Sequence, residues 1–331
     1  MSGEKIIGIT IGDPAGIGPE IVLKALTNHP EIYDWCRPVV FAPEEIVLRT
    51  LRQLKRQPIL RIIRSEIPLN LSLKANEIVV FDTPLFEPLP SLGRISAQGG
   101  RMAYEAIRLA IEMARQGALR AIATAPINKQ SLKAGDVPFT DHTAMFKELT
   151  RSAQVMTLFM SGKLRIFFYS RHIPFREIPA SLNQEKLVQT MEQALAHLGK
   201  LGLGHPRLAL AALNPHGGEN GLFGDEEQTI LKPAVREAQR KGWDVVGPVP
   251  ADSVFHLNLS GEFDAVLSLY HDQGHIAAKT HDFYGTVSLT MGLPFLRTSV
   301  DHGTAFDIAG QNKANEHSMV EALRIASRYA W

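Results

Sequence analysis

Three histidines follow short apolar runs of the sequence, at the points where buried strands would end: His172, His216 and His271. Parallel neighbouring strands bring their carboxyl ends together, and open α/β sheets bind ligands at that edge. Neutral imidazole is a common ligand for divalent metals, and three protein ligands with one open position are typical of catalytic sites. The spacings match no local metal motif, so topology alone predicts one divalent ion here (Zn, Mg, Mn or Co). Separate structural roles for the three histidines are the alternative.

Four further residues could hold an anion. His142 and Thr143 stand in a polar stretch at an expected helix start, which suits an anionic ligand. Lys279 and Arg297 stand in apolar, turn-rich surroundings, where a cation needs an anionic partner. Together they predict a small acidic substrate that could carry a phosphate, although surface charges remain the alternative for the two cations.

The opening stretch IIGITIGDPAGIGPEI, residues 6–21, contains Gly16-Ile17-Gly18. The dinucleotide fingerprint needs a third glycine, which lets the helix pack closely on the strand. Ile21 stands at that position, so the sequence argues against an ordinary Rossmann site.

Short apolar runs alternate with helical patterns such as 99–116 and 184–202, which is typical of parallel βαβ units. Near-continuous apolarity indicates strands that are covered on both faces. The expected strands are 6–12, 38–42, 77–82, 120–126, 155–160, 165–170, 208–214, 264–270 and 286–292. A length of 331 residues suits two domains, with a boundary near residue 137.

Composition excludes several classes of partner. The net charge of +1 and the absence of a basic stripe argue against nucleic acid, and the basic segment 49–57 is expected to be a solvated helix face. No apolar run has the ~20 residues of a membrane span. The single cysteine, Cys36, is expected to be a small buried residue rather than a nucleophile, and it fits a cytoplasmic protein.

The segment 301–315, DHGTAFDIAGQNKAN, resembles the adenosine-binding loop of the isocitrate and isopropylmalate dehydrogenases. The resemblance implies an α/β fold of two α/β/α domains with the cofactor in a cleft between them. It also implies cofactor contacts at His302, Gly303, Asp307 and Asn315. Asp307 stands where NAD-dependent members keep an acid for the ribose hydroxyls, so NAD is expected rather than NADP.

The motifs GDPAGIGPE, LNPHGGE, GPVPAD and YHDQG, with MGLPFLRTSVDHGTA near the end, together resemble the 4-hydroxythreonine-4-phosphate dehydrogenase family over almost the whole chain. This resemblance implies that His172, His216 and His271 are the metal ligands. It implies substrate contacts at His142, Thr143, Lys279 and Arg297. It also implies a homodimer with the site near the subunit interface. The expected domains are 1–136 with 289–331 on the nucleotide side, and 137–288 for metal, substrate and dimerisation.

Two departures from that pattern bear on the substrate. Asp141 stands where the vitamin-pathway enzymes have glycine, and Ser288 stands where they have an asparagine substrate contact. The segments TDHTAMF, GLFGDEE and ADSVFH resemble the branch that acts on D-threonate or D-erythronate 4-phosphate. We therefore favour that sugar-acid phosphate, with Ser288 as a substrate contact. 4-Hydroxy-L-threonine 4-phosphate, giving 3-amino-2-oxopropyl phosphate, is the alternative, and a dihydrodiol dicarboxylate is a third option.

The expected reaction is oxidation at carbon 3 with NAD, followed by decarboxylation of the β-keto acid to dihydroxyacetone phosphate and carbon dioxide. Asp252 and Asp272 are the candidate proton acceptors, although Asp272 could instead orient a ligand histidine. A transferase on the same fold and a non-catalytic phosphosugar sensor remain competing classes.

Overall fold

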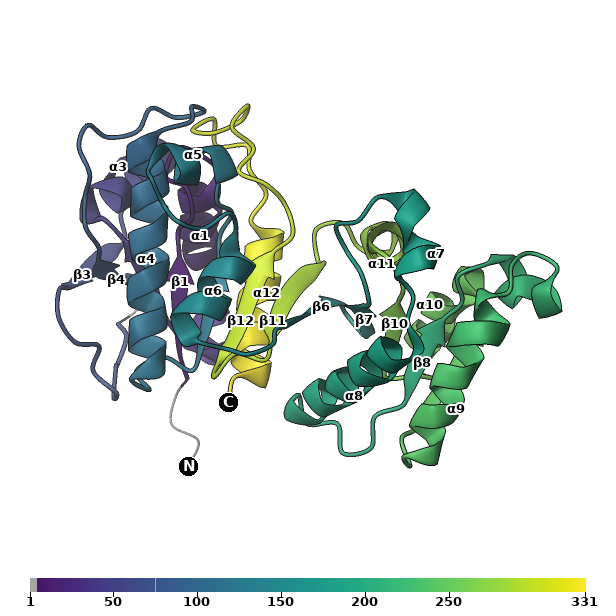
Figure 1. Cartoon of the computed structure of the whole chain (residues 1–331). Coiled ribbons are helices and arrows are strands. Elements are labelled where there is room, and N and C mark those ends of the chain that lie inside the picture. Colours follow the sequence, from purple (N-terminus) through teal and green to yellow (C-terminus); the bar gives the residue numbers. More distant parts are fainter. Residues whose placement is uncertain (1–4, 75) are drawn as a thin grey trace. The chain divides into compact units, whose positions relative to one another are not determined.

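The computed structural model describes residues 5–74 and 76–331. Its contacts divide the chain into unit 1, Met1–Val155 with Val287–Trp331, and unit 2, Met156–Thr286 (Figure 1). The first boundary was expected near residue 137 and falls at 155 instead. The reason is that Met145 and Phe146 are buried in the same apolar cluster as unit-1 residues such as Ile107.

Unit 1 is built on a sheet whose strands run in the order β3-β4-β2-β1-β5-β12-β11. All of its neighbours pair in parallel except β11 and β12. The strands are β1 (Ile6–Thr10), β2 (Arg37–Ala42), β3 (Ile59–Ile63), β4 (Glu77–Asp82), β5 (Ala121–Thr124), β11 (Val287–Met291) and β12 (Leu296–Val300).

Helices cover both faces of this sheet, as the burial of its central strands requires. Helix α4 packs on β1, β2 and β5 and also contacts α5 and α6, whereas α12 packs on β12 and β5 and contacts α1 and α2. The helices are α1 (Gly18–Asn28), α2 (Ile32–Trp35), α3 (Glu44–Leu54), α4 (Ala97–Arg115), α5 (Lys129–Ala134), α6 (His142–Thr150) and α12 (His317–Tyr329).

Unit 2 is built on strands in the order β6-β7-β10-β8-β9. Strands β7, β10, β8 and β9 are parallel, and β6 pairs antiparallel with β7. The strands are β6 (Met156–Ser161), β7 (Leu164–Phe168), β8 (Leu208–Ala211), β9 (Val245–Val249) and β10 (Ala265–Ser268).

Helices α10 and α11 pack on this sheet, and α8 and α9 pack on each other in front of it in Figure 1. The helical elements are η1 (Phe175–Glu177), α7 (Ile178–Ser181), α8 (Gln184–Lys200), η2 (Pro215–Gly221), η3 (Glu227–Leu231), α9 (Lys232–Arg240), α10 (Ala251–Ser260) and α11 (His271–His281). Within the described ranges, no helix combines the length and apolarity that crossing a membrane requires.

The α/β class expected from the sequence is confirmed, but two strand pairs are antiparallel and do not belong to the expected parallel βαβ units. Gly162 and Lys163 alone separate β6 from β7, and this connection is too short for a parallel crossover. Four residues, 292–295, separate β11 from β12, with the same consequence. Strands β3 and β9, at the ends of the sheet order, and β12 were not expected.

Candidate active site

The three expected histidines follow the carboxyl ends of three neighbouring strands of unit 2. Phe168 of β7 is in register with Ser268 of β10, and Leu267 of β10 is in register with Leu210 of β8. Because the three strands are parallel and adjacent, their carboxyl ends lie side by side. His172, His271 and His216 follow these ends in β7-β10-β8 order. The topological part of the sequence argument is therefore confirmed.

His271 is the first residue of α11 and stands at the middle of this edge. Its ring centroid lies 6.0 Å from that of His172. It also stacks on His275, one helical turn later, at 3.6 Å with an interplanar angle of 11°. Its Nδ1 lies 2.7 Å from Oδ1 of Asp272.

His216 lies in η2, where five successive residues from His216 to Asn220 have positive φ. Residues other than glycine rarely adopt this backbone conformation, so the run marks a strained loop. Strained backbone of this kind is often found at functional sites. Nδ1 of His216 lies 2.7 Å from Oε1 of Glu219, and the His216 side chain is 64% exposed.

His216 and His271 share an arrangement that suits metal ligands. A neutral imidazole that donates from Nδ1 to a carboxylate keeps its Nε2 lone pair for a metal, and ligand histidines commonly have such a partner. The chemistry of these donors therefore fits a divalent ion. In the described part of the chain, no three His, Cys, Asp or Glu side chains are already gathered in a metal-binding arrangement. His172 and His271 are close together, and His216 has to join them to complete the predicted triad.

A buried carboxylate that the sequence analysis missed supports the His216 loop. Glu227 is fully buried, and its Oε1 accepts hydrogen bonds from the backbone N–H groups of Leu213 and Asn214, both at 2.8 Å. Its Oε2 accepts from Nδ2 of Asn214 at 2.8 Å. Gly218 also lies against it, since a Cβ there would come within 2.7 Å of Oε2. Glu227 thus fixes the chain just before His216 by hydrogen bonds and lies against the chain just after it.

Arg297 is the strongest anion-binding candidate in unit 1. It is 4% exposed on β12, and its guanidinium donates from Nη1 to Oγ1 of Thr290 and from Nη2 to Oγ1 of Thr124, both at 2.8 Å. The same group lies 5.1 Å from the ring centroid of Phe146. A guanidinium presents paired N–H donors that match the geometry of a phosphate or carboxylate. No local sequence pattern points to Thr124 or Phe146, which lie far from Arg297 along the chain.

His142 begins α6 on the same unit. Its Nε2 is buried and has no hydrogen-bond partner among the described residues. Burial, and secondly the charge of Arg297, hold the pKa of His142 well below its ordinary value. His142 is therefore neutral near pH 7 and can donate or accept a hydrogen bond, as can the adjacent hydroxyl of Thr143.

Asp141, one of the two departures from the family pattern, has a structural role. It is the N-cap of α6, and its Oδ1 accepts a hydrogen bond from the backbone N–H of Ala144 at 3.0 Å. Such a cap stabilises the helix that presents His142 and Thr143. Asp141 therefore does not by itself distinguish the substrates.

The other predicted residues divide between the two units. In unit 2, Lys279 lies on α11 with Nζ 4.8 Å from the ring centroid of Phe283, and Asp252 is exposed in the first turn of α10. In unit 1, Ser288 lies on β11 opposite Ser299 and is half-buried.

The opening loop packs against the segment 301–315 within unit 1. The N–H of Ile17 donates to the carbonyl of Thr304 at 3.0 Å, and a Cβ on Gly16 would lie 2.7 Å from that carbonyl oxygen. Gly18 is equally constrained, since its Cβ would meet the carbonyl of Ile11. These glycines permit close approach of backbone segments.

Further contacts hold the opening loop and the segment 301–315 in place. Lys24 bridges Glu20 and the carbonyl of Ala314, at 2.9 and 2.8 Å. Arg49 donates to the carbonyls of Pro14 and Pro90, which corrects the expectation that segment 49–57 is wholly a solvated face. Cys36 is buried, as expected, and burial raises the pKa of its thiol to about 12.

The four predicted cofactor contacts lie in the 301–315 segment or at its end. His302 Nε2 lies 3.0 Å from Oγ of Ser318, and Oδ1 of Asn315 accepts from the N–H of His317 at 2.8 Å. Gly303 and Asp307 are exposed. Asp307 is thus open to a ligand such as a ribose hydroxyl pair.

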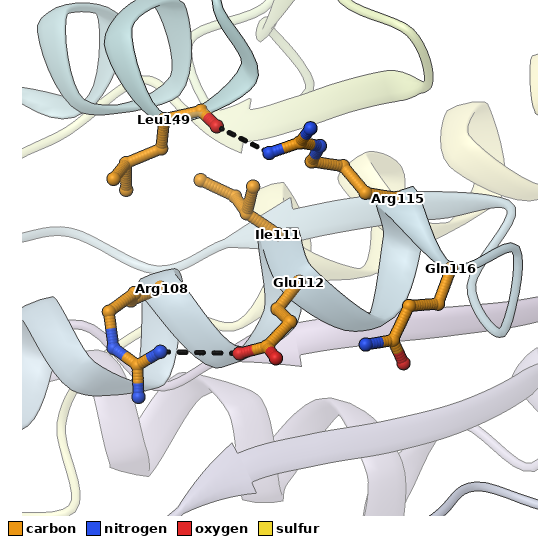
Figure 2. A pocket seen from close by; sticks show the side chains of 6 residues that line it. All are labelled: Arg108, Ile111, Glu112, Arg115, Gln116 and Leu149. Atoms are coloured by element: carbon orange, nitrogen blue, oxygen red, sulfur yellow. Dashed lines mark hydrogen bonds and ion pairs between the residues drawn. The ribbon is translucent and has the colours of Figure 1, made fainter.

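A cavity of about 500 Å³ in unit 1 is lined by other residues. Figure 2 shows its lining by α4 and Leu149. Arg115 donates to the carbonyl of Leu149 at 3.3 Å, and Arg108 pairs with Glu112 at 3.2 Å. The cations that line it thus have partners within the protein, and the cavity contains none of the predicted site residues.

Comparison with known proteins defines the class of this protein. It is 46% identical to a protein of Symbiobacterium thermophilum named "Putative D-threonate 4-phosphate dehydrogenase", over 100% of this chain and 98% of that protein. A relative of the same name from Clostridium botulinum (strain Hall) is 42% identical, with the same coverage of both chains. The protein is therefore an oxidoreductase of the dehydrogenase type.

The family follows from the match of residues 34–326 to the family described as "Pyridoxal phosphate biosynthetic protein PdxA". The chain belongs to that family. A crystal structure of a 4-hydroxythreonine-4-phosphate dehydrogenase from Klebsiella pneumoniae is similar with a TM-score of 0.89 and 40% identity, covering 99% of this chain and 98% of that one. Membership in this dehydrogenase family suggests a nicotinamide cofactor and a divalent metal.

Proposed function

We propose that this protein oxidises and decarboxylates D-threonate or D-erythronate 4-phosphate to dihydroxyacetone phosphate and carbon dioxide, with NAD as oxidant. The observation that carries the proposal is the delivery of His172, His271 and His216 to one edge by adjacent parallel strands. The names of relatives at 46% and 42% identity support the sugar-acid substrate.

In the proposed reaction, the C3 hydroxyl loses its proton and C3 loses hydride to NAD, which leaves a 3-keto acid. The C1–C2 bond then breaks, carbon dioxide departs, and C2 takes a proton. A bound divalent ion would supply Lewis acidity that lowers the pKa of the C3 hydroxyl.

In this proposal His172, His216 and His271 hold the ion, while Glu219 and Asp272 orient two of these imidazoles through Nδ1. Because Asp272 is engaged in this way, Asp252 is the better candidate for the proton acceptor.

The anionic groups of the substrate are assigned to the cationic and polar residues. Arg297 offers a guanidinium held by two threonine hydroxyls, which suits forked binding of a phosphate or carboxylate. His142, Thr143, Lys279 and Ser288 would add hydrogen bonds or charge. For the cofactor, we propose contacts at His302, Gly303, Asp307 and Asn315, with exposed Asp307 selecting NAD over NADP.

We also propose a homodimer. Unit 2 exposes large apolar side chains in the segments that follow β7, η2 and α11, among them Phe175 (75% exposed), Leu222 (71%) and Phe283 (59%). Exposed apolar surface of this kind is typical of an interface, and a second copy would cover it. Sedimentation of the wild type should give the mass of a dimer, and a monomer would refute this assignment.

A substrate panel tests the function. Purified protein is incubated with NAD, added divalent ion and either D-threonate, D-erythronate or 4-hydroxy-L-threonine 4-phosphate, and NADH is followed by absorbance. We expect faster turnover of a sugar-acid phosphate and loss of NADH formation with a chelator. Equal or better turnover of 4-hydroxythreonine phosphate would favour the alternative, which the Klebsiella pneumoniae neighbour supports. No NADH with any of them would favour a transferase or a sensor.

A further inference from the structure

A buried amide links the strand ends that lead to the histidines. Gln273 is 8% exposed, two residues after His271. Its Oε1 accepts hydrogen bonds from the N–H of Leu269 at 2.7 Å and from Oγ of Ser268 at 3.1 Å. Its Nε2 donates to the carbonyl of Ala212 at 2.7 Å. One side chain therefore joins the end of β10 to the end of β8.

The third strand end is joined to the same point by a hydroxyl. Oγ of Ser170, two residues before His172, donates to the carbonyl of Leu269 at 2.7 Å. Leu269 is thus held on its N–H side by Gln273 and on its carbonyl side by Ser170. The segments that lead to all three candidate ligands are connected through Gln273, Leu269 and Ser170.

The chemistry of these contacts requires an amide. A backbone N–H can only donate and a carbonyl can only accept, so Leu269 needs an acceptor and Ala212 needs a donor. A glutamine side chain supplies both. A carboxylate at the same place would set an oxygen against the Ala212 carbonyl, and an apolar residue would leave buried backbone groups without partners, which costs roughly 1–3 kcal/mol per group.

We propose that Gln273 is a positioning residue for the metal site, which sets the spacing of the His271 and His216 segments through these bonds. This rests on the proposed function, because it takes the three histidines as the ligands. Residues that orient metal ligands typically change metal affinity about 10–100-fold when altered. We expect a weakening of that size for Gln273 variants, with the fold retained.

The chain offers a matched control at the opposite edge of the same sheet. Asn258 is 2% exposed, its Oδ1 accepts from the N–H of Arg165 at 3.2 Å, and its Nδ2 donates to the carbonyl of Phe263 at 2.7 Å. It is a buried amide that joins backbone groups near β7 and β10, but at their amino ends. Asn258→Asp should therefore reduce stability without reducing metal affinity.

The test measures Co²⁺ binding to the full-length protein after metal removal, by the visible absorption of the bound ion and by chelator competition. The variants are Gln273→Glu, Gln273→Met and Asn258→Asp, and thermal unfolding reports folding of each. We expect Co²⁺ affinity about 10–100-fold weaker with an altered absorption spectrum for both Gln273 variants, and wild-type affinity for Asn258→Asp. If the Gln273 variants do not fold, Ser170→Ala is used, which removes one bond and should weaken Co²⁺ binding by a smaller factor.

The outcomes separate the positioning role of Gln273 from the proposed metal site. Folded Gln273 variants, or Ser170→Ala, with wild-type affinity and spectrum would overturn the positioning role while leaving the proposed function intact. Equal weakening by Asn258→Asp would also overturn it, because any buried amide would then have the same effect. Failure of the wild type to bind Co²⁺, or undiminished binding by His271→Ala, would overturn the proposed metal site itself.

Discussion

Nδ1 of His271 lies 2.7 Å from Oδ1 of Asp272, the next residue along the chain. The pair begins α11, so the backbone that fixes the helix start also fixes the imidazole and its carboxylate partner. The carboxylate favours the tautomer that carries its proton on Nδ1, and this leaves Nε2 for a metal. We therefore propose that Asp272 orients the imidazole and that another residue is the proton acceptor.

The variant Asp272→Asn tests whether Asp272 orients His271. The amide keeps the size of the side chain but removes the carboxylate that accepts from Nδ1 of His271. We expect Co²⁺ affinity about 10-fold weaker, measured by chelator competition. Unchanged affinity together with a large loss of kcat would restore Asp272 as a candidate proton acceptor.

Asp252→Asn should behave in the opposite way. Asp252 is exposed at the start of α10, and it is proposed to take the proton of the substrate hydroxyl. We expect kcat to fall about 10²–10⁴-fold, the usual contribution of acid–base catalysis, while Co²⁺ affinity stays at the wild-type value. A variant with wild-type kcat would remove Asp252 from the mechanism.

Arg297→Met should impair binding of the phosphorylated substrate. The substitution removes the buried guanidinium between Thr124 and Thr290 while keeping an unbranched side chain beside Phe146. Hydrogen bonds to charged groups contribute roughly 1.5–3 kcal/mol, so we expect KM to rise at least about 10-fold. Inorganic phosphate should inhibit the wild type competitively and the variant less. Unchanged KM and inhibition would count against Arg297 as a substrate contact.

The sequence could predict much of the scaffold but not its side-chain contacts. The apolar runs at β7, β8 and β10 predicted buried parallel strands, and this alone brings the three histidine segments to one edge. The missed strands have a weaker signal: β3 and β9 lie at the ends of the sheet order and are only partly buried, and β9 contains Gly247-Pro248. Strand β12 is buried but carries Arg297, Thr298 and Ser299. These polar residues interrupt the apolar run by which a buried strand is predicted.

The contacts that define the candidate site depend on residues far apart in sequence. Arg297 bonds to Thr124, 173 positions away, and no local pattern encodes that pair. Likewise the bond from Gln273 to Ala212 joins residues 61 positions apart. Only the register of β11 with β12, which places Thr290 opposite Arg297, could have been inferred once that hairpin was recognised.

The depressed pKa of His142 predicts a pH dependence of stability. Its folded-state pKa lies well below 6.5 because of burial and the charge of Arg297. The unfolded chain therefore binds a proton first as pH falls below about 6.5, and the stability contributed by neutral His142 is lost as the pH drops further. His142→Gln should lose less stability than the wild type between pH 7.5 and 5.5, measured by urea unfolding. Parallel curves for the two proteins would contradict this.

Asp13 predicts the reverse dependence. Burial raises its pKa above 3.8, although hydrogen bonds from Ser131 and Ala15 partly oppose the shift. The folded protein then holds this proton more tightly than the unfolded chain, so the free energy of unfolding falls as pH rises through the folded-state pKa. Asp13→Asn, which mimics the protonated acid, should raise Tm at pH 7 and bring less gain at pH 4. A lower Tm at pH 7 would show that the charged carboxylate is stabilising.

Zinc affinity of single-histidine variants tests the shared metal site most directly. His172→Ala, His216→Ala and His271→Ala are compared with His281→Ala, which removes an exposed imidazole at the far end of α11. If the three imidazoles hold one ion, each of the first three variants binds Zn²⁺ at least about 100-fold more weakly in chelator competition, and His281→Ala binds it like the wild type. Wild-type affinity in any of the first three would show that its imidazole is not a ligand, and the three-histidine account would be wrong.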